Sequence, residues 1–193
     1  MHGSPIASPS RNCRCLGTPL VADCRDRCIM TGTTHALISL EERFAQGILD
    51  GTKKVELRRR PMRIAEGTTI WMYVKVPIGK VIGSAEVRSV HTLSPEALWC
   101  RYGDILGLSR TEFLEYLFGV ERGFVLVLCN AKRLAIPVPL EQLRALNGSF
   151  QPPQFFQHLS SGGPLVAAFT NEVAFAPQAR HQIVAHAKQS RNR

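Results

Sequence analysis

The sequence has no hydrophobic run long enough to cross a membrane. Its longest uninterrupted apolar stretch runs from Phe124 to Cys129, whereas a spanning helix needs roughly 20 residues. The first 34 residues also contain no apolar stretch of about 7–15 residues, the length typical of a secretory signal. We therefore expect a cytoplasmic protein that does not associate with membranes.

Several kinds of catalytic chemistry leave no signature in the chain. No glycine-rich loop of the nucleoside-triphosphate-binding type is present. The histidines, among them His91 and His158, show no paired spacing of the kind that metal sites use. No base stands next to Ser39, Ser84 or Ser94 to activate a serine nucleophile. The sequence predicts neither a bound metal nor a cofactor.

Acidic residues are scarce, and the excess of positive charge is localised. The chain has 24 Lys and Arg against 15 Asp and Glu, a net charge of +9. Residues 35–160 contain 16 basic and 12 acidic residues, and residues 53–63 alone contain six basic residues and one acid. The remainder of 35–160 is therefore close to neutral. A concentrated basic segment favours acidic partners, of which nucleic acid is the commonest.

The two ends of the chain differ in composition from its middle. Residues 1–34 are rich in Ser, Pro, Gly and Cys and have no helical or strand periodicity, which predicts a disordered tail or an upstream extension ahead of a natural start at Met30. Residues 161–193 begin with a Ser-Gly-Gly-Pro linker, which predicts a mobile basic tail with a short helix at 179–188. In the cytoplasm cysteines are expected to be free thiols or metal ligands rather than disulfides. Four cysteines could bind zinc, although their spacing is not that of most structural zinc sites: Cys13, Cys15, Cys24 and Cys28.

The middle of the chain, residues 35–160, is predicted to contain five or six strands with short helices inserted between them, without a regular alternation of strand and helix. Ser94-Pro95 and Ser109 carry the signals of helix starts, the second of them a capping box. Phe113, Tyr116 and Phe118 follow at helical spacing and are expected to pack in the core. The other expected elements are helices at 41–49 and 139–146, and strands at 35–40, 53–60, 68–76, 80–91, 123–130 and 131–139. Strands joined mostly by short turns predict an α+β fold built on a small, strongly bent mixed barrel.

The strand at 53–60 is the candidate site. Strict alternation places Lys54, Glu56, Arg58 and Arg60 on one face, and Val55 and Leu57 on the face toward the barrel core. Glu56 would then pair with the cations two residues away and orient Arg58 to bind a phosphate through two nitrogens. The alternative is a solvated surface with weak ion pairs, each worth about 0–1 kcal/mol.

Residues 35–159 resemble an ASCH domain, the module named for homology to the activating signal cointegrator. The resemblance runs in order along the chain and is carried by the segments at 36–40, 51–60, 71–74, 81–87, 98–99, 113–119 and 152–156. Its core is Gly51-x-Lys53-x-x-Glu56-x-Arg58. The resemblance implies a PUA-like β-barrel fold, to which the elements predicted above add short inserted helices and the composition of the two ends adds flexible tails.

The resemblance also implies a relation to RNA. ASCH proteins are associated with RNA binding and with regulation of transcription or translation, so we expect a basic cleft that binds RNA. Its expected residues are Lys53, Lys54, Glu56, Arg58, Arg60 and Tyr73, the last because its phenol needs a polar partner.

A few members of the family resemble enzymes, namely acetylcytidine amidohydrolases and a ribonuclease. The alternative function is therefore a small hydrolase that uses Lys53 and Glu56. The amidohydrolase branch has threonine three residues after its lysine, where this chain has Glu56. That difference argues against hydrolysis of acetylcytidine.

Overall fold

The computed structural model describes residues 34–170 of the 193-residue chain. The predicted N-terminal tail with its four cysteines, the proposed start at Met30 and the predicted helix at 179–188 lie outside the described residues. Among the described residues, no helix is both long and apolar enough to span a membrane.

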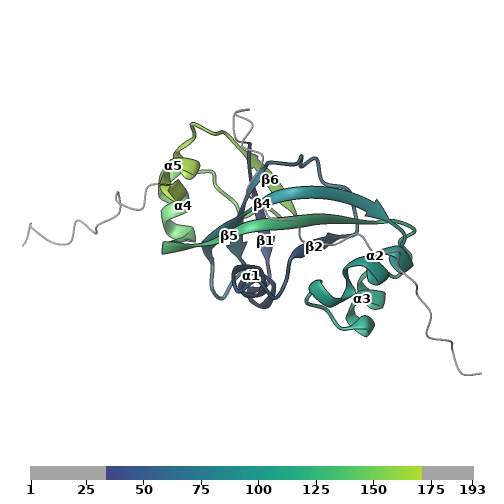
Figure 1. Ribbon diagram of the computed structural model, residues 1–193. Helices are drawn as coiled ribbons and strands as arrows, with labels where there is room; N and C mark the ends of the chain where they lie inside the picture. Colours follow the sequence, from purple (N-terminus) through teal and green to yellow (C-terminus); the bar gives the residue numbers. More distant parts are fainter. Residues whose placement is uncertain (1–33, 171–193) are drawn as a thin grey trace, which may run out of the picture.

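The described residues form one curled, six-stranded sheet with short helices around it (Figure 1). The strands lie in the order β2-β5-β4-β3-β1-β6, and β1 pairs with β3 in parallel while all other neighbours are antiparallel. The strands are β1 (His35–Leu40), β2 (Val55–Arg58), β3 (Thr69–Val74), β4 (Lys80–Leu93), β5 (Gly123–Pro139) and β6 (Phe156–Leu159). The helices are α1 (Glu42–Leu49), α2 (Pro95–Tyr102), the 3₁₀ turn η1 (Gly103–Ile105), α3 (Arg110–Tyr116), α4 (Leu140–Leu146) and α5 (Pro164–Thr170). This mixed architecture confirms the α+β, PUA-like fold class.

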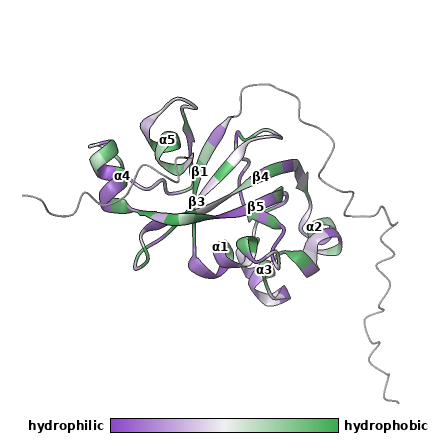
Figure 2. Ribbon diagram, turned by 60° about the vertical axis from the view of Figure 1, so that its left-hand side comes forward, coloured by the Kyte–Doolittle hydropathy of each residue, from purple (hydrophilic) through white to green (hydrophobic). Residues whose placement is uncertain are grey.

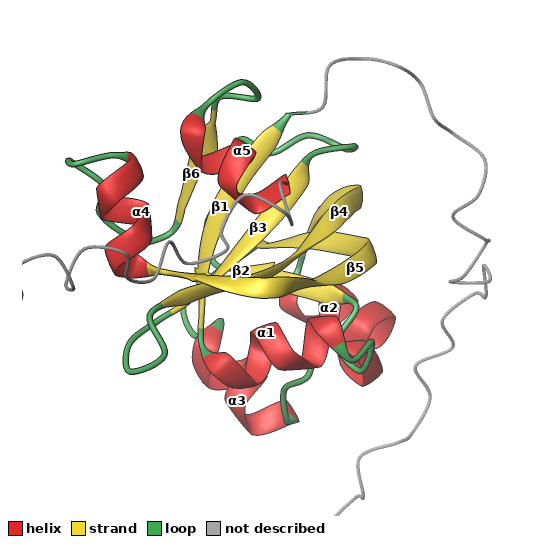
Figure 3. Ribbon diagram, turned by 90° about the vertical axis from the view of Figure 1, so that its left-hand side faces the viewer, coloured by secondary structure: helices red, strands yellow, loops and turns green. Residues whose placement is uncertain are grey.

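Two groups of helices cover the sheet at different places (Figure 3). Helices α2 and α3 follow the far end of β4 and pack with η1 under β2 and β5, through Leu98, Leu106 and Phe113. Helices α4 and α5 pack together at the other end, around Leu37 and Trp71. Hydrophobic and hydrophilic residues are interspersed along the strands, while α1 carries a hydrophilic stretch (Figure 2). The first group is the one that frames the candidate site.

Local sequence signals explain where α2 and α3 begin. The Ser94 hydroxyl accepts a hydrogen bond from the backbone N–H of Ala97, with Pro95 at the first helical position. Ser109 and Glu112 form the expected capping box, in which each side chain bonds the other residue's backbone N–H. Because these caps satisfy N–H groups that a helix leaves without partners, they fix the starts of both helices.

Two boundary predictions need correction. The strands expected at 123–130 and 131–139 are a single strand, β5, which stays paired with β4 across the irregular register near Asn130. The packed unit also continues past residue 160, because α5 buries Leu165, Val166 and Phe169. The linker at 161–163 therefore leads into a helix of the folded unit.

The faces of β2 are opposite to the prediction. Val55 and Leu57 lie in the cluster with α2 and α3 and not in the main core of the sheet. Glu56 lies across from Leu126, and Leu126 belongs to the main core. Paired residues on neighbouring strands point to the same side, so Glu56 points inward. The alternation of side chains along β2 was predicted correctly. The error arose because α2 and α3 form a second apolar layer, which the sequence of the strand does not reveal.

Candidate functional site

Lys53 is buried at the entrance to β2. The turn after α1 uses Gly51 with φ +77°, a conformation that glycine adopts without strain, and the Lys53 backbone N–H donates to the Gly47 carbonyl at 2.9 Å. The lysine is only 4% exposed. The backbone of this turn therefore directs Lys53 into the protein.

The Lys53 ammonium has three different neighbours. It donates to the carbonyl of Leu106 at 2.6 Å, lies 3.6 Å from Glu56 Oε2 and lies 5.0 Å from the centre of the Phe44 ring. Its aliphatic stem packs against Gly107, whose φ of +67° disfavours any residue with a side chain. Contacts from α1, β2 and the η1–α3 loop thus hold one amine in place.

Glu56 links Lys53 to Arg58. It is 5% exposed, and its Oε1 lies 3.0 Å from Arg58 Nε. The N–H of Nε is not aligned with that oxygen well enough for a hydrogen bond, so the contact is an ion pair. One carboxylate therefore lies between two cations in a buried environment, where ion pairs and their desolvation are both large.

Arg58 bridges two separate parts of the sheet. Its NH2 donates to the Ser39 carbonyl on β1 at 3.3 Å. The Ser39 hydroxyl in turn donates to the carbonyl of Pro153 at 2.5 Å. Strand β2 is one edge of the sheet, and β1 and β6 lie at the other. The site therefore lies where the two edges of the curled sheet approach each other.

Burial lowers the pKa of Lys53 below its ordinary value of 10.5. Glu56 opposes this shift by favouring the ammonium, while Arg58 and Arg43 add to it through charge repulsion. The net lowering reflects the cost of desolvating a charged amine. A lysine with a lowered pKa gives up its proton more readily than a surface lysine does, which suits acid–base catalysis.

A cleft of about 360 Å³ opens over the three residues, and we call it the Lys53 cleft. Four cations and four carboxylates line it, namely Arg43, Lys53, Arg58 and Lys75 with Glu41, Glu56, Glu112 and Glu115. The cleft is thus balanced in charge, contrary to the expected basic floor, because the fold brings Glu41, just before α1, and Glu112 and Glu115 of α3 into the same cleft as Lys53 and Arg58.

Tyr116 also lines the Lys53 cleft, although its helical spacing predicted a core position. It is 38% exposed, and its hydroxyl donates to the Leu57 carbonyl at 3.4 Å. Burial raises the pKa of this phenol, so it remains a hydrogen-bond donor at neutral pH. Phe113 is buried as predicted, whereas Phe118 is exposed.

The structure brings together Lys53, Glu56 and Arg58 among the residues predicted from sequence, and separates the other three. Lys54 is exposed and lines a different hollow. Arg60 is exposed and lines neither cavity. Tyr73 is 2% exposed in the core cluster near α4 and α5, so its predicted place in the cleft is corrected. The register of β3 with β1 places its ring on the covered face of the sheet.

Sequence reasoning missed the partners that other elements contribute. Ser39, Arg43 and Tyr116 come from β1, α1 and α3, and no local pattern connects them with β2. Within residues 34–170, no group of three or more His, Cys, Asp or Glu side chains is arranged to bind a metal ion.

Known proteins similar to this chain define its family. Residues 30–160 match a family described as "Domain of unknown function (DUF365)". A curated relative from Zymomonas mobilis, an "ASCH domain-containing ribonuclease", is 36% identical over 120 residues, which cover 62% of this chain and 80% of that protein.

Solved structures agree with this assignment. The crystal structure of the ASCH protein from Zymomonas mobilis superposes with a TM-score of 0.64 at 34% identity, covering 69% of this chain and 94% of that one. A mutant of that protein gives a TM-score of 0.63 at the same identity, covering 67% and 90%. The fold is therefore that of a PUA-like domain. The chain belongs to the ASCH domain family.

Proposed function

We propose that this protein is a ribonuclease that cleaves RNA in the Lys53 cleft. One observation carries the proposal: a lysine with a lowered pKa, a carboxylate and an arginine form a buried group at the base of an open cleft. Burying three charges is unfavourable unless other interactions compensate, and such groups are concentrated at functional sites. The relative named as a ribonuclease supports the assignment.

The residues have distinct roles in the proposed reaction. Arg58 binds the phosphodiester and stabilises the charge that develops on its non-bridging oxygens. Glu56 accepts the proton of the ribose 2′-hydroxyl as the 2′-oxygen attacks phosphorus. Lys53 donates a proton to the departing 5′-oxygen as the phosphorus–oxygen bond breaks.

The products are a 2′,3′-cyclic phosphate and a 5′-hydroxyl end. Glu56 is left with an added proton and Lys53 lacks one. Because Nζ and Oε2 lie 3.6 Å apart, return of the proton from Glu56 to Lys53 restores the starting state. No net proton is consumed, and the same pair can act again.

The test compares two lysine variants of the full chain on a labelled single-stranded RNA. Lys53→Met is expected to reduce kcat by at least ~100-fold, the usual effect of losing a general acid. Lys80→Met is the matched control, since Lys80 is exposed at the start of β4 and lines neither cavity. Equal cleavage by the Lys53 variant and the control would refute the role of Lys53.

A second candidate function is RNA binding without cleavage, in a regulator of transcription or translation. The observation in its favour is that the Lys53 ammonium is already bonded to the Leu106 carbonyl and paired with Glu56. A lysine held in this way can have a purely structural role. In that case the wild-type chain would bind RNA without forming cyclic-phosphate ends. Arg58→Ala would still weaken binding severalfold, because Arg58 is the cation placed to meet a phosphate.

The same preparation should be incubated with acetylcytidine. Release of acetate that is lost in Lys53→Met would identify the amidohydrolase reaction. We expect none, because Glu56 occupies the position of the threonine in that branch.

A further inference from the structure

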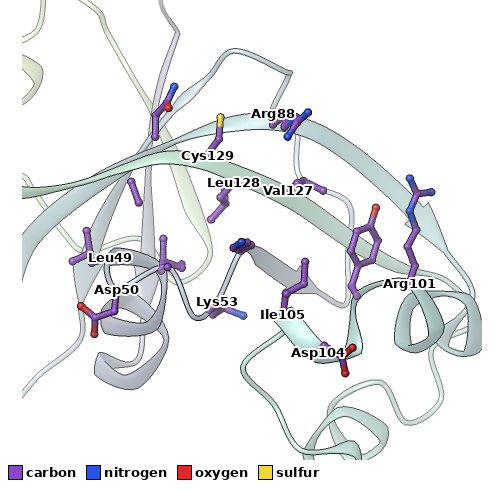
Figure 4. Close-up of a pocket in the computed structure, with 16 residues that line it drawn as sticks. Leu49, Asp50, Lys53, Arg88, Arg101, Asp104, Ile105, Val127, Leu128 and Cys129 are labelled. Atoms are coloured by element: carbon purple, nitrogen blue, oxygen red, sulfur yellow. The ribbon is translucent and has the colours of Figure 1, made fainter. Parts of the chain in front are cut away.

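A second hollow lies on the other side of Lys53. It has a volume of about 590 Å³ and is formed by the end of α1, the strands β4 and β5, and the α2–η1 segment. We call it the basic hollow. Lys53 lines both this hollow and the Lys53 cleft, so the two cavities share this residue. Figure 4 shows Lys53 among the residues that line the basic hollow.

The basic hollow has an excess of positive charge that the Lys53 cleft lacks. Lys54, Arg88 and Arg101 line it, all three are exposed, and none forms an ion pair with another residue in the range 34–170. Figure 4 shows Arg88 on a strand and Arg101 on a helix, at different sides of the opening. Of its two acids, Asp50 is already paired with Arg133 at 2.5 Å. Asp104, the other acid, forms no ion pair among the described residues, so the lining of the hollow keeps a net positive charge.

Other features of the hollow fit a nucleotide better than a free inorganic anion. Ile105, Val127 and Leu128 provide an apolar wall, which can contact a base or a ribose. The Tyr102 side chain also lines the hollow, and its buried hydroxyl has no hydrogen-bond partner within the described part of the chain. Buried phenols ordinarily have one, so this hydroxyl is a donor left over by the protein. The volume is within the usual range of about 300–1,000 Å³ for ligand pockets.

We propose that the basic hollow binds the nucleotide next to the scissile phosphate of a single RNA strand. This proposal rests on the proposed ribonuclease function and adds a subsite to it. Lys53 marks the boundary between the two subsites: the reacting phosphate lies on the cleft side, and the flanking phosphate meets Lys54, Arg88 and Arg101. In a duplex each base is paired and stacked between its neighbours, whereas a single strand can place the face of one base against the apolar wall.

The subsite should be tested by binding, so that the result does not depend on cleavage. The parent is Lys53→Met in the full chain, which keeps the substrate intact. To it is added the triple change Lys54→Ala, Arg88→Ala and Arg101→Ala, or, as the matched control, Arg144→Ala on the distant helix α4. The probes are a labelled dinucleotide and a labelled ten-nucleotide single strand, each over a range of salt concentrations.

We expect the triple change to weaken binding of the ten-nucleotide strand about tenfold and to leave dinucleotide binding within about twofold. The slope of log affinity against log salt concentration should become less negative by about 1–2, because fewer counterions are released on binding. The Arg144 control should change neither quantity. Tyr102→Phe, which removes only the leftover hydroxyl, should weaken the longer strand severalfold while leaving thermal stability unchanged.

Two results would overturn the subsite. Unchanged affinity for the longer strand would show that RNA does not enter the hollow. Equal loss for both probes would show a general charge effect and not a flanking site. A wild-type chain that fails to cleave RNA would refute the proposed function alone, since the length-dependent binding is measured separately.

Discussion

Replacing Glu56 and Lys53 one at a time should affect stability in very different ways. Glu56→Ala removes the carboxylate that two buried cations share, at 3.6 Å from Lys53 and 3.0 Å from Arg58. Lys53→Met removes one cation and leaves Glu56 paired with Arg58. The methionine retains the length and packing of the lysine stem against Gly107.

The expected magnitudes follow from what each change leaves behind. Glu56→Ala should lower the free energy of unfolding by about 3–5 kcal/mol, the usual effect of stranding a buried charge. For a folded unit of this size that corresponds to a fall in Tm of about 10–15 °C. Lys53→Met should stay within about 1.5 kcal/mol of the wild type, because the lost hydrogen bond to Leu106 is offset by relief of desolvation.

The pH dependence gives an independent check on Lys53. Its pKa is lowered in the folded chain by burial, from 10.5, so between the two pKa values the unfolded chain binds more protons. Stability of the wild type should therefore rise with pH toward 10.5 relative to Lys53→Met, and the difference should be constant at lower pH. Urea unfolding of both variants across pH 6–10.5, roughly the range in which lysine titrates, measures this directly.

Two results would refute the reasoning. If Glu56→Ala unfolds within about 0.5 kcal/mol of the wild type, in the range of ordinary surface substitutions, the group is not buried and charged as described. If Lys53→Met is as damaging as Glu56→Ala, Lys53 is needed for folding, and its loss of activity could no longer be attributed to chemistry.

Two further predictions concern other parts of the fold. Ending the chain after residue 160 removes α5 with Leu165, Val166 and Phe169. In thermal unfolding this truncation should lower the free energy of unfolding by about 5 kcal/mol, whereas ending the chain after Thr170 should have no such effect. Equal stability of the two truncations would show that α5 does not pack. Hydrogen bonds from the Ser109 backbone, the Arg43 side chain and the Ser109 hydroxyl lower the pKa of Glu112 to about 2. Glu112 should therefore contribute to stability above its unfolded pKa and lose that contribution only as pH falls toward 2. In Arg43→Gln, NMR titration should show a higher pKa for Glu112. An unchanged pKa of Glu112 in that variant would contradict the prediction.

Local sequence signals predicted much of the fold correctly. Ser94-Pro95, the capping box at Ser109 and the glycine turn at Gly51 each act within a few residues, so their consequences can be read directly from the chain. Lys53, Glu56 and Arg58 were singled out through the resemblance to ASCH domains, whose core is Gly51-x-Lys53-x-x-Glu56-x-Arg58, and the structure places these three side chains next to one another.

The predictions that failed depended on long-range packing. Tyr73 alternates along β3 in the same way whether its face is open or covered, and only α4 and α5 decide that it is covered. The inward direction of Glu56 depends on helices α2 and α3 burying the opposite face of β2. The balance of charge in the cleft depends on carboxylates from α1 and α3, which lie far from β2 in sequence.

The bond between Arg58 and the Ser39 carbonyl has a consequence for how the site responds to motion. Strand β2 is only four residues long, and within residues 34–170 it pairs with β5 alone. The guanidinium thus fastens the free side of β2 to β1, and the carboxylate that orients it also holds the Lys53 amine. If β1 and β2 separate, Arg58 loses its bond to Ser39 and the contacts within the Lys-Glu-Arg group are disrupted at the same time. A ligand whose phosphate engages Arg58 would act on both, clamping the two edges of the sheet together as it binds.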